Sequence, residues 1–292
     1  MNPTAAILAL LVCAVASADG FIQRDGSQLT LDGEPYRAIG VNMPHLSQSY
    51  LGTWFHWQQI YGTREAMKQS IIDALDDAAA RKVAFIRFFA SPGYPKDTAE
   101  LYLADPDEYW RRMDEVFALC RERNIKLIPS LGVLKWSSDC RELKPAVLDP
   151  DSKTHAATYK YVREFVTRYK DDPTVLMWEL ENEAFLIADV DMQGRKALPA
   201  GCYPTGTEGL AEEHVREDSF TFDMLIQLYR EATAFIKEID PNHLVTSGDS
   251  GPREESMSRR LTFPDFKYRN DTLREHISNL LDSQPAPLDV MS

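Results

Sequence analysis

Short apolar runs alternate with longer amphipathic stretches along most of the chain. The apolar runs fall at 36–41, 83–89, 125–131, 175–183, 243–247 and 288–291. The amphipathic stretches, in which apolar residues return every three or four positions, fall at 64–82, 106–124, 153–170, 222–236 and 272–281. The first pattern predicts buried strands and the second predicts helices. Strand–helix alternation of this kind predicts a parallel sheet covered by helices, preceded at 21–34 by a short hairpin.

Two architectures of this α/β class fit the alternation, an open doubly wound sheet and a closed barrel. A dinucleotide-binding open sheet should carry a glycine-rich turn after its first strand. The segment Ile39-Gly40-Val41-Asn42 lacks that pattern. Long loops after the first, third and fourth strands favour a (β/α)8 TIM barrel with a cleft at its C-terminal face. About six of the eight βα units are present, and we expect a chain truncated at its C-terminus.

Carboxylates gather at the end of the apolar run 175–183. Glu179, Glu181 and Glu183 occupy alternate positions, so a strand would project all three to one side. Buried carboxylates need partners. One explanation is a salt-bridge network in a barrel interior. The other is catalysis, with Glu183 as an acid/base group and Asn182 bound to substrate. Arg87, inside an apolar strand, would pair with Glu179 or Glu181 in the structural alternative.

The segment Trp178-Glu179-Leu180-Glu181-Asn182-Glu183 resembles the fourth-strand signature of glycoside hydrolase family 5, whose clan consists of (β/α)8 retaining enzymes. The resemblance runs from residues 40–42 to 289–291. It implies two glutamates, one that protonates the leaving oxygen and one that attacks the anomeric carbon. By motif position Glu183 is the acid/base, Asn182 contacts the sugar 2-hydroxyl, and Arg87 keeps the nucleophile ionised.

The family places its nucleophilic glutamate at the end of the seventh strand. We therefore expect the nucleophile beyond the C-terminus, and we expect this chain alone to be inactive. Glu254 and Glu255 in the loop after the fifth strand match no family motif and are interpreted as solvated charges.

Aromatic residues on the predicted cleft loops are candidate platforms for sugar rings. Trp54 and Trp57 lie in the first long loop and Trp136 in the third. Loop packing is the alternative explanation for each. Asn42 and His45, after the first strand, are further candidates for substrate binding. Many family members have a histidine at the end of the third strand, where this chain has Ser130-Leu131-Gly132 followed by Lys135-Trp136. This departure favours mannanase-like members over typical cellulases.

Charge and composition narrow the choice of partner. A formal net charge of −13 argues against nucleic acid and against anionic membranes, and it suits a neutral polysaccharide. No Cys/His spacing indicates a metal site, and no cofactor is expected. We expect a polysaccharide as the substrate and a monomer for the full-length protein.

Residues 1–18 are predicted to be a secretory signal peptide, because the apolar run Ala5–Ala16 is followed by the cleavage pattern Ala16-Ser17-Ala18. The barrel domain would then occupy 19–292 as a partial domain, and the protein would be extracellular or periplasmic. Cys120 is predicted to be a buried thiol. Cys140 and Cys202, in two irregular stretches, could form a disulfide, although their spacing alone does not decide it.

The leading hypothesis is a secreted, endo-acting retaining hydrolase of β-1,4-linked polysaccharide, either mannan or cellulose/glucan. The alternative is a non-catalytic glycan-binding TIM barrel. An open-sheet oxidoreductase is a third hypothesis, and the missing glycine fingerprint argues against it. A nucleophile on the seventh strand of the full reading frame would decide between the first two.

Overall fold

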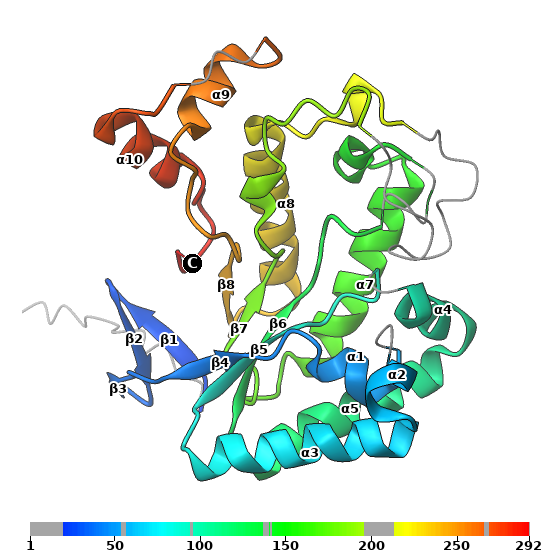
Figure 1. Cartoon of the computed structure of the whole chain (residues 1–292). Coiled ribbons are helices and arrows are strands. Elements are labelled where there is room, and N and C mark those ends of the chain that lie inside the picture. Colours follow the sequence, from blue (N-terminus) through cyan, green and yellow to red (C-terminus); the bar gives the residue numbers. More distant parts are fainter. Residues whose placement is uncertain are drawn as a thin grey trace, which may run out of the picture.

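The computed structural model describes residues 20–53, 57–93, 96–136, 140, 142–195, 213–265 and 269–291. Its main sheet has five parallel strands, hydrogen-bonded in the order in which they follow along the chain (Figure 1). These strands are β4 (Gly40–Asn42), β5 (Phe85–Phe89), β6 (Lys126–Ser130), β7 (Met177–Glu179) and β8 (Leu244–Thr246). A doubly wound sheet would reverse its strand order at a switch point. The sequential order is therefore the one that a barrel requires.

The strands are shorter than the apolar runs that indicated them, as the first and the sixth illustrate. The first forms sheet pairs only from Gly40, and Ile39 just before it is 80% exposed. The sixth is reduced to a single bridge between Thr246 and Val290. An apolar run marks where a strand could lie, but its ends depend on the neighbouring strand that supplies the hydrogen bonds.

The N-terminal hairpin is confirmed. Antiparallel strands β1 (Ile22–Asp25) and β2 (Gln28–Leu31) are extended by the short strand β3 (Glu34–Pro35). Ile22 is fully buried against Leu176, Met177 and Leu244, which lie at the N-terminal ends of β7 and β8. The hairpin thus covers the end of the sheet opposite to the predicted cleft.

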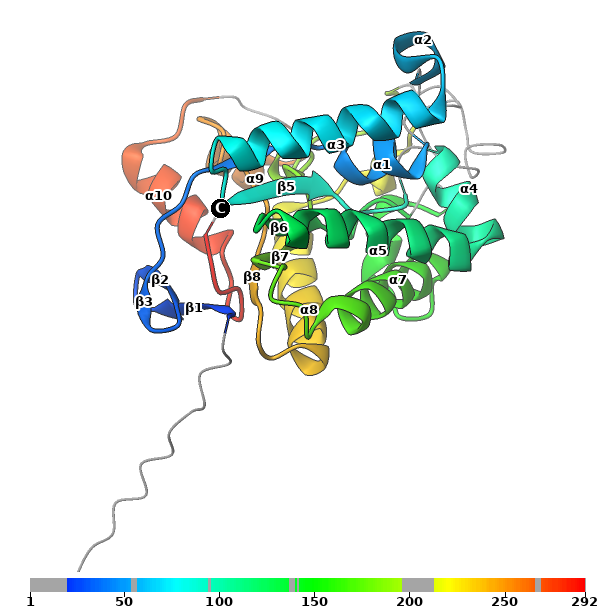
Figure 2. The same ribbon diagram turned by 90° about the horizontal axis from the view of Figure 1, so that it is seen from below.

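Four long helices follow one another along the outside of the sheet (Figure 2). They are α3 (Arg64–Ala80), α5 (Pro106–Glu122), α7 (Lys153–Tyr169) and α8 (Phe222–Ile239). Each begins after a residue whose side-chain oxygen accepts a backbone N–H three positions on, namely Thr63, Asp105, Ser152 and Thr221. This capping satisfies an amide that the first turn would otherwise leave unbonded. The helices predicted from periodicity are confirmed.

The segments between these elements contain more regular structure than the sequence predicted. The additional helices are α1 (Leu46–Leu51), α2 (Trp57–Tyr61), α4 (Lys96–Ala104) and α9 (Ser256–Thr262), with 3-10 turns η1 (Lys144–Leu148), η2 (Ala184–Leu186) and η3 (Arg216–Asp218). The last long helix, α10 (Leu273–Asp282), lies within one residue of its predicted position. Most of the additional helices are too short to show a clear periodicity.

The hydrophobic core lies between the sheet and the long helices. Trp178 of β7 is fully buried, and its Nε1 donates to Asp240 Oδ2 at 2.7 Å. Phe117 of α5 stacks on Tyr169 of α7 with ring centroids 3.7 Å apart. Cys120 is buried as predicted, and burial raises the pKa of its thiol to about 12, so it stays protonated and unreactive.

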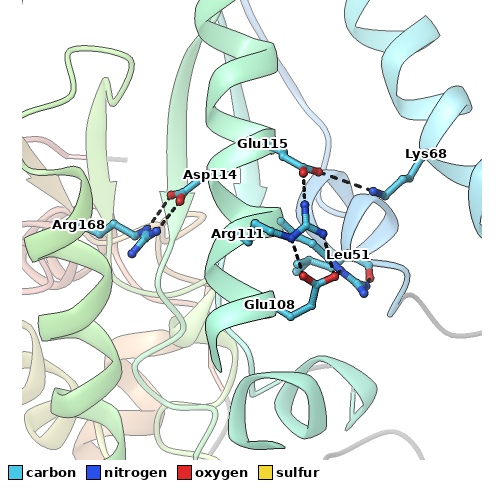
Figure 3. A network of polar contacts seen from close by, with 8 residues as sticks. Leu51, Lys68, Glu108, Arg111, Asp114, Glu115 and Arg168 are labelled. Atoms are coloured by element: carbon cyan, nitrogen blue, oxygen red, sulfur yellow. Dashed lines mark hydrogen bonds and ion pairs between the residues drawn. The ribbon is translucent and has the colours of Figure 1, made fainter. Parts of the chain in front are cut away.

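Ion pairs on the solvent side of α5 connect it to its neighbours (Figure 3). Glu115 accepts from Arg111 within α5 and lies 3.7 Å from Lys68 Nζ of α3. Asp114 accepts from Arg168 Nε of α7 at 2.7 Å. Because these groups are largely exposed, the pairs contribute little to stability. They link α5 to α3 and α7 at the surface.

Several predictions concern residues outside the described part of the chain. The signal peptide falls there, as do Trp54 and Cys202, so secretion and the Cys140–Cys202 disulfide stay predictions. Among the described residues, no helix combines the length and the apolar composition that a membrane span requires.

Candidate active site

The C-terminal ends of the parallel strands bring the predicted site residues to one edge of the sheet. The strand register pairs Asn42 with Arg87 across β4 and β5, and Ser130 with Glu179 across β6 and β7. Asn182 and Glu183 follow β7 in the chain. The clustering expected for a cleft at this edge is therefore present for Asn42, Arg87 and the carboxylates.

Arg87 holds this cluster together. Its Nε donates to both Glu179 carboxylate oxygens, at 2.8 and 3.0 Å. Its two terminal nitrogens donate to the Oδ1 atoms of Asn182, at 2.8 Å, and Asn42, at 3.3 Å. The Glu179 side chain is 5% exposed, and burial raises its pKa while Arg87 opposes the rise. Arg87 is thus the structural partner of Glu179, and it also orients two amides.

The orientation of Asn182 has a direct consequence for binding. With its Oδ1 accepting from Arg87, its amide N–H groups are left to donate. A donor at this edge suits a sugar hydroxyl. The contact itself stays a prediction.

Glu181 is fixed by the loop after β6. It is 1% exposed, and its carboxylate lies 3.1 Å from Lys135 Nζ and accepts from the Leu134 amide at 2.8 Å. No role for this lysine is predicted from the sequence. Three closely spaced glutamates indicated that cations must lie nearby, but no sequence signal pointed to this loop.

The prediction that one strand projects Glu179, Glu181 and Glu183 to the same side is wrong. The strand ends at Glu179, and the backbone at Glu183 turns left-handed with φ 51° and ψ 38°. Alternation of side chains holds only within a strand, so Glu183 is exposed while Glu179 and Glu181 are buried. Among the described residues, its carboxylate forms no hydrogen bond or ion pair. A left-handed conformation costs a non-glycine residue roughly 1 to 3 kcal/mol and is common at functional sites.

Of the three tryptophans predicted to stack on sugar rings, the structure describes the side chain of one. Trp136 is 3% exposed, with ring centroids 5.9 Å from Tyr102 and 6.2 Å from Tyr161. It is a core residue and not a sugar platform, because the loop after β6 turns its ring onto the helix layer. Trp57 begins α2, but its side chain lies outside the described part of the structure.

His45 immediately precedes α1, close to the end of β4. Burial lowers the pKa of its imidazole, so the ring is neutral at pH 7 and can both donate and accept a hydrogen bond. Its contact with substrate stays a prediction. Glu254, interpreted as a solvated charge, is exposed, whereas the partly buried Glu255 pairs with Arg259 of α9.

Within the described ranges, no group of three or more His, Cys, Asp and Glu side chains is placed to hold a metal ion. The chemistry that this edge can support rests on carboxylates and amides. It offers one exposed carboxylate at Glu183, two paired ones at Glu179 and Glu181, and amides at Asn42 and Asn182.

Known proteins with similar sequences were found among mannan-cleaving enzymes. No protein-family model matches the chain. The chain is 24% identical over 254 residues to mannan endo-1,4-beta-mannosidase F of Aspergillus fumigatus, covering 80% of this chain and 48% of the relative. It is 23% identical over 298 residues to mannan endo-1,4-beta-mannosidase 3 of Solanum lycopersicum, covering 94% and 64%. The chain spans about half the length of the first of these relatives.

Two solved structures of mannanases resemble the fold of this chain. The beta-1,4-mannanase of the sea hare Aplysia kurodai superposes with a TM-score of 0.53 at 16% identity, over 90% of this chain and 71% of that one. The endo-1,4-beta-mannanase of Rhizomucor miehei gives 0.52 at 20% identity, over 79% and 61%. The predicted (β/α)8 fold class and the resemblance to family 5 mannanases are confirmed.

Proposed function

We propose that the protein is a secreted, endo-acting retaining hydrolase of β-1,4-mannan, with Glu183 as its general acid/base. One observation carries the proposal. Of three glutamates at the C-terminal edge of a barrel sheet, Glu183 alone is exposed and forms no ion pair with any described residue, whereas Glu179 and Glu181 are paired with Arg87 and Lys135. The mannan-cleaving names of the relatives support the substrate class.

The chemical roles follow from these environments. A general acid must carry a proton at the start of the reaction, and a neighbouring cation would hold its carboxylate ionised. Glu183 is exposed and forms no ion pair within the described residues, and in this proposal it protonates the leaving oxygen and then activates water. Glu179 and Glu181 are buried, are paired with Arg87 and Lys135, and serve to arrange the site.

The nucleophile is the second part of the proposal. The family resemblance places it on a seventh strand, about 5 to 5.5 Å from the acid/base carboxyl. We keep that assignment and do not offer Glu179 or Glu181 in its place. Arg87 binds Glu179, Asn42 and Asn182, and its role is to orient Asn182 toward the sugar 2-hydroxyl.

The test is reducing-sugar release from mannan, cellulose and mixed-linked glucan. It compares the 292-residue chain with a version extended along the reading frame beyond Ser292. Activity on mannan that is lost in Glu183→Gln and kept in Glu238→Gln supports the proposal. Glu238 is a matched control because it is exposed on α8, away from the C-terminal ends of the strands.

Two results would contradict the proposal. Activity that survives in Glu183→Gln would show that the acid/base lies elsewhere. Binding of mannan without hydrolysis by either chain length would favour the non-catalytic glycan-binding barrel.

A further inference from the structure

The loop after β8 is hydrogen-bonded to the segment after β7, beyond the point where both strands end. The Glu181 amide donates to the Ser247 carbonyl at 3.1 Å, and the Glu183 amide donates to the Gly248 carbonyl at 2.9 Å. The two segments therefore stay in contact along the whole stretch that carries the carboxylates.

Gly248 makes this contact possible. Its φ is +81°, and a Cβ at this position would lie 1.9 Å from the Glu181 carbonyl oxygen and 2.5 Å from Glu179 Cγ. The Glu181 carbonyl oxygen belongs to the backbone, so it cannot move aside as the end of a flexible side chain could. Only glycine allows the loop to approach the carboxylate segment so closely.

Asp249 continues the connection with its side chain. Its carboxyl group is 5% exposed, and Oδ1 accepts from the Phe185 amide at 2.9 Å. Its Oδ2 accepts from the hydroxyl of Tyr229, a fully buried residue of α8, at 2.5 Å. A chain of contacts thus runs from α8 through Tyr229 and Asp249 to the turn that follows Glu183.

Two backbone amides of the turn at Glu183 are bound by the loop after β8. The Glu183 amide is bound to Gly248, and the amide two residues later is bound to Asp249. The Glu183 carboxylate has no hydrogen bond of its own within the described residues, and the backbone conformation sets the direction in which the side chain leaves the chain. The left-handed conformation at Glu183 persists because its surroundings fix it.

We infer that Asp249, held by Tyr229, is a positioning residue that keeps Glu183 in the left-handed turn from which its carboxylate reaches substrate. The inference rests on the proposed function of Glu183. Asp249 is buried and does not itself contact a sugar. Burial raises the pKa of Asp249 to about 6. Both its ionised and its neutral form accept from the Phe185 amide, so asparagine is the conservative replacement.

The experiment combines hydrogen exchange with kinetics in the version extended beyond Ser292, as wild type, Asp249→Ala, Asp249→Asn and the control Asp189→Ala. Asp189 is also buried, at 4% exposure, and also accepts a backbone amide, that of Phe222, at 3.1 Å. It therefore matches Asp249 in chemistry but does not hold the Glu183 turn.

We expect Asp249→Ala to speed exchange at the Glu183 and Phe185 amides about tenfold or more, because a local opening becomes easier. We expect kcat on mannan to fall about tenfold to a hundredfold, with KM within about twofold, because Glu183 is misplaced. Asp249→Asn should retain most of kcat, and Asp189→Ala should change neither the two amides nor kcat.

Unchanged exchange at Phe185 in Asp249→Ala would overturn the inference. An unchanged kcat despite faster exchange, or an equal loss in Asp189→Ala, would do the same. If the extended wild type were inactive while exchange at Phe185 still rose in Asp249→Ala, the proposed function would fail, and the anchoring of the turn would stand as a separate result.

Discussion

The guanidinium group of Arg87 binds both carboxylate oxygens of Glu179 at the centre of the C-terminal edge of the sheet. The pair joins β5 to β7 across the intervening β6, because a charged group on each strand reaches the same point. It also gives Asn42 and Asn182 a common donor. A change at either charge should therefore affect stability and the arrangement of the site together.

Removing Arg87 alone should cost more than removing both partners. In Arg87→Met the Glu179 carboxylate is left buried without its partner, and we expect a loss of about 3 to 5 kcal/mol in the free energy of unfolding. The double variant Arg87→Met/Glu179→Leu should recover a large part of that loss. Urea unfolding of the single and double variants measures it. A double variant as unstable as the sum of the single variants would contradict a coupled pair.

Gly248 should tolerate no side chain. A methyl group there overlaps the Glu181 carbonyl, so Gly248→Ala should destabilise the protein by about 1 to 3 kcal/mol or more through overpacking and backbone strain. Gly251→Ala is the matched control, because Gly251 also has a positive φ but nothing within 4 Å of an added Cβ. Equal melting temperatures for the two variants would show that the close approach of the loop is not what makes glycine necessary.

The buried carboxyl of Asp249 should make stability depend on pH. Burial raises its pKa from the ordinary 3.8 to about 6, so between these values the folded protein binds more protons than the unfolded chain. Stability due to this group therefore falls as pH rises through that window, by roughly 3 kcal/mol at most. Asp249→Asn should remove this contribution, and Asp189→Asn, whose carboxyl also has a pKa of about 6, should remove one of the same sign.

Urea unfolding between pH 3.5 and about 7 measures the difference between each variant and wild type. The variants should gain stability relative to wild type as pH rises. Parallel curves would contradict the assignment.

Trp136 should behave as a core residue. Its ring packs among Tyr102 and Tyr161, and its buried Nε1 has no hydrogen-bond partner among the residues that the structure describes. Trp136→Ala should cost about 3 to 5 kcal/mol of stability. Trp136→Phe removes an unsatisfied N–H as well as volume, so it should cost clearly less. Thermal melts compare the two, and an unchanged melt with weakened mannan binding would restore the sugar-platform interpretation.

The fold was largely predictable from local sequence patterns. Periodicity at 106–124 and 153–170 located α5 and α7, and the missing glycine turn after residue 41 argued against a doubly wound sheet. Chemistry also identified Arg87 as a partner of Glu179 or Glu181, because a charge inside an apolar strand needs a partner. These predictions succeed because each depends on residues within one element or on a strong local cost.

The predictions that failed depend on contacts between distant segments. The turn at Glu183 is bound by a loop more than 60 residues later. In that loop, Gly248 binds the Glu183 amide and Asp249 binds the Phe185 amide. Trp136 is buried because α4 and α7 supply Tyr102 and Tyr161, and no local pattern distinguishes such a tryptophan from an exposed one. The pairing of Lys135 with Glu181 likewise depends on how the loop after β6 turns.

The acid/base role of Glu183 is tested most directly by the leaving group. Glu183→Ala should lose about a hundredfold to ten-thousandfold in kcat/KM on mannan, whose leaving oxygen needs a proton. On a dinitrophenyl manno-oligosaccharide, whose leaving group departs without protonation, the first step should be almost unaffected, and added azide should speed turnover by replacing water as the second nucleophile. An equal loss on both substrates, without rescue by azide, would show that Glu183 is not the acid/base.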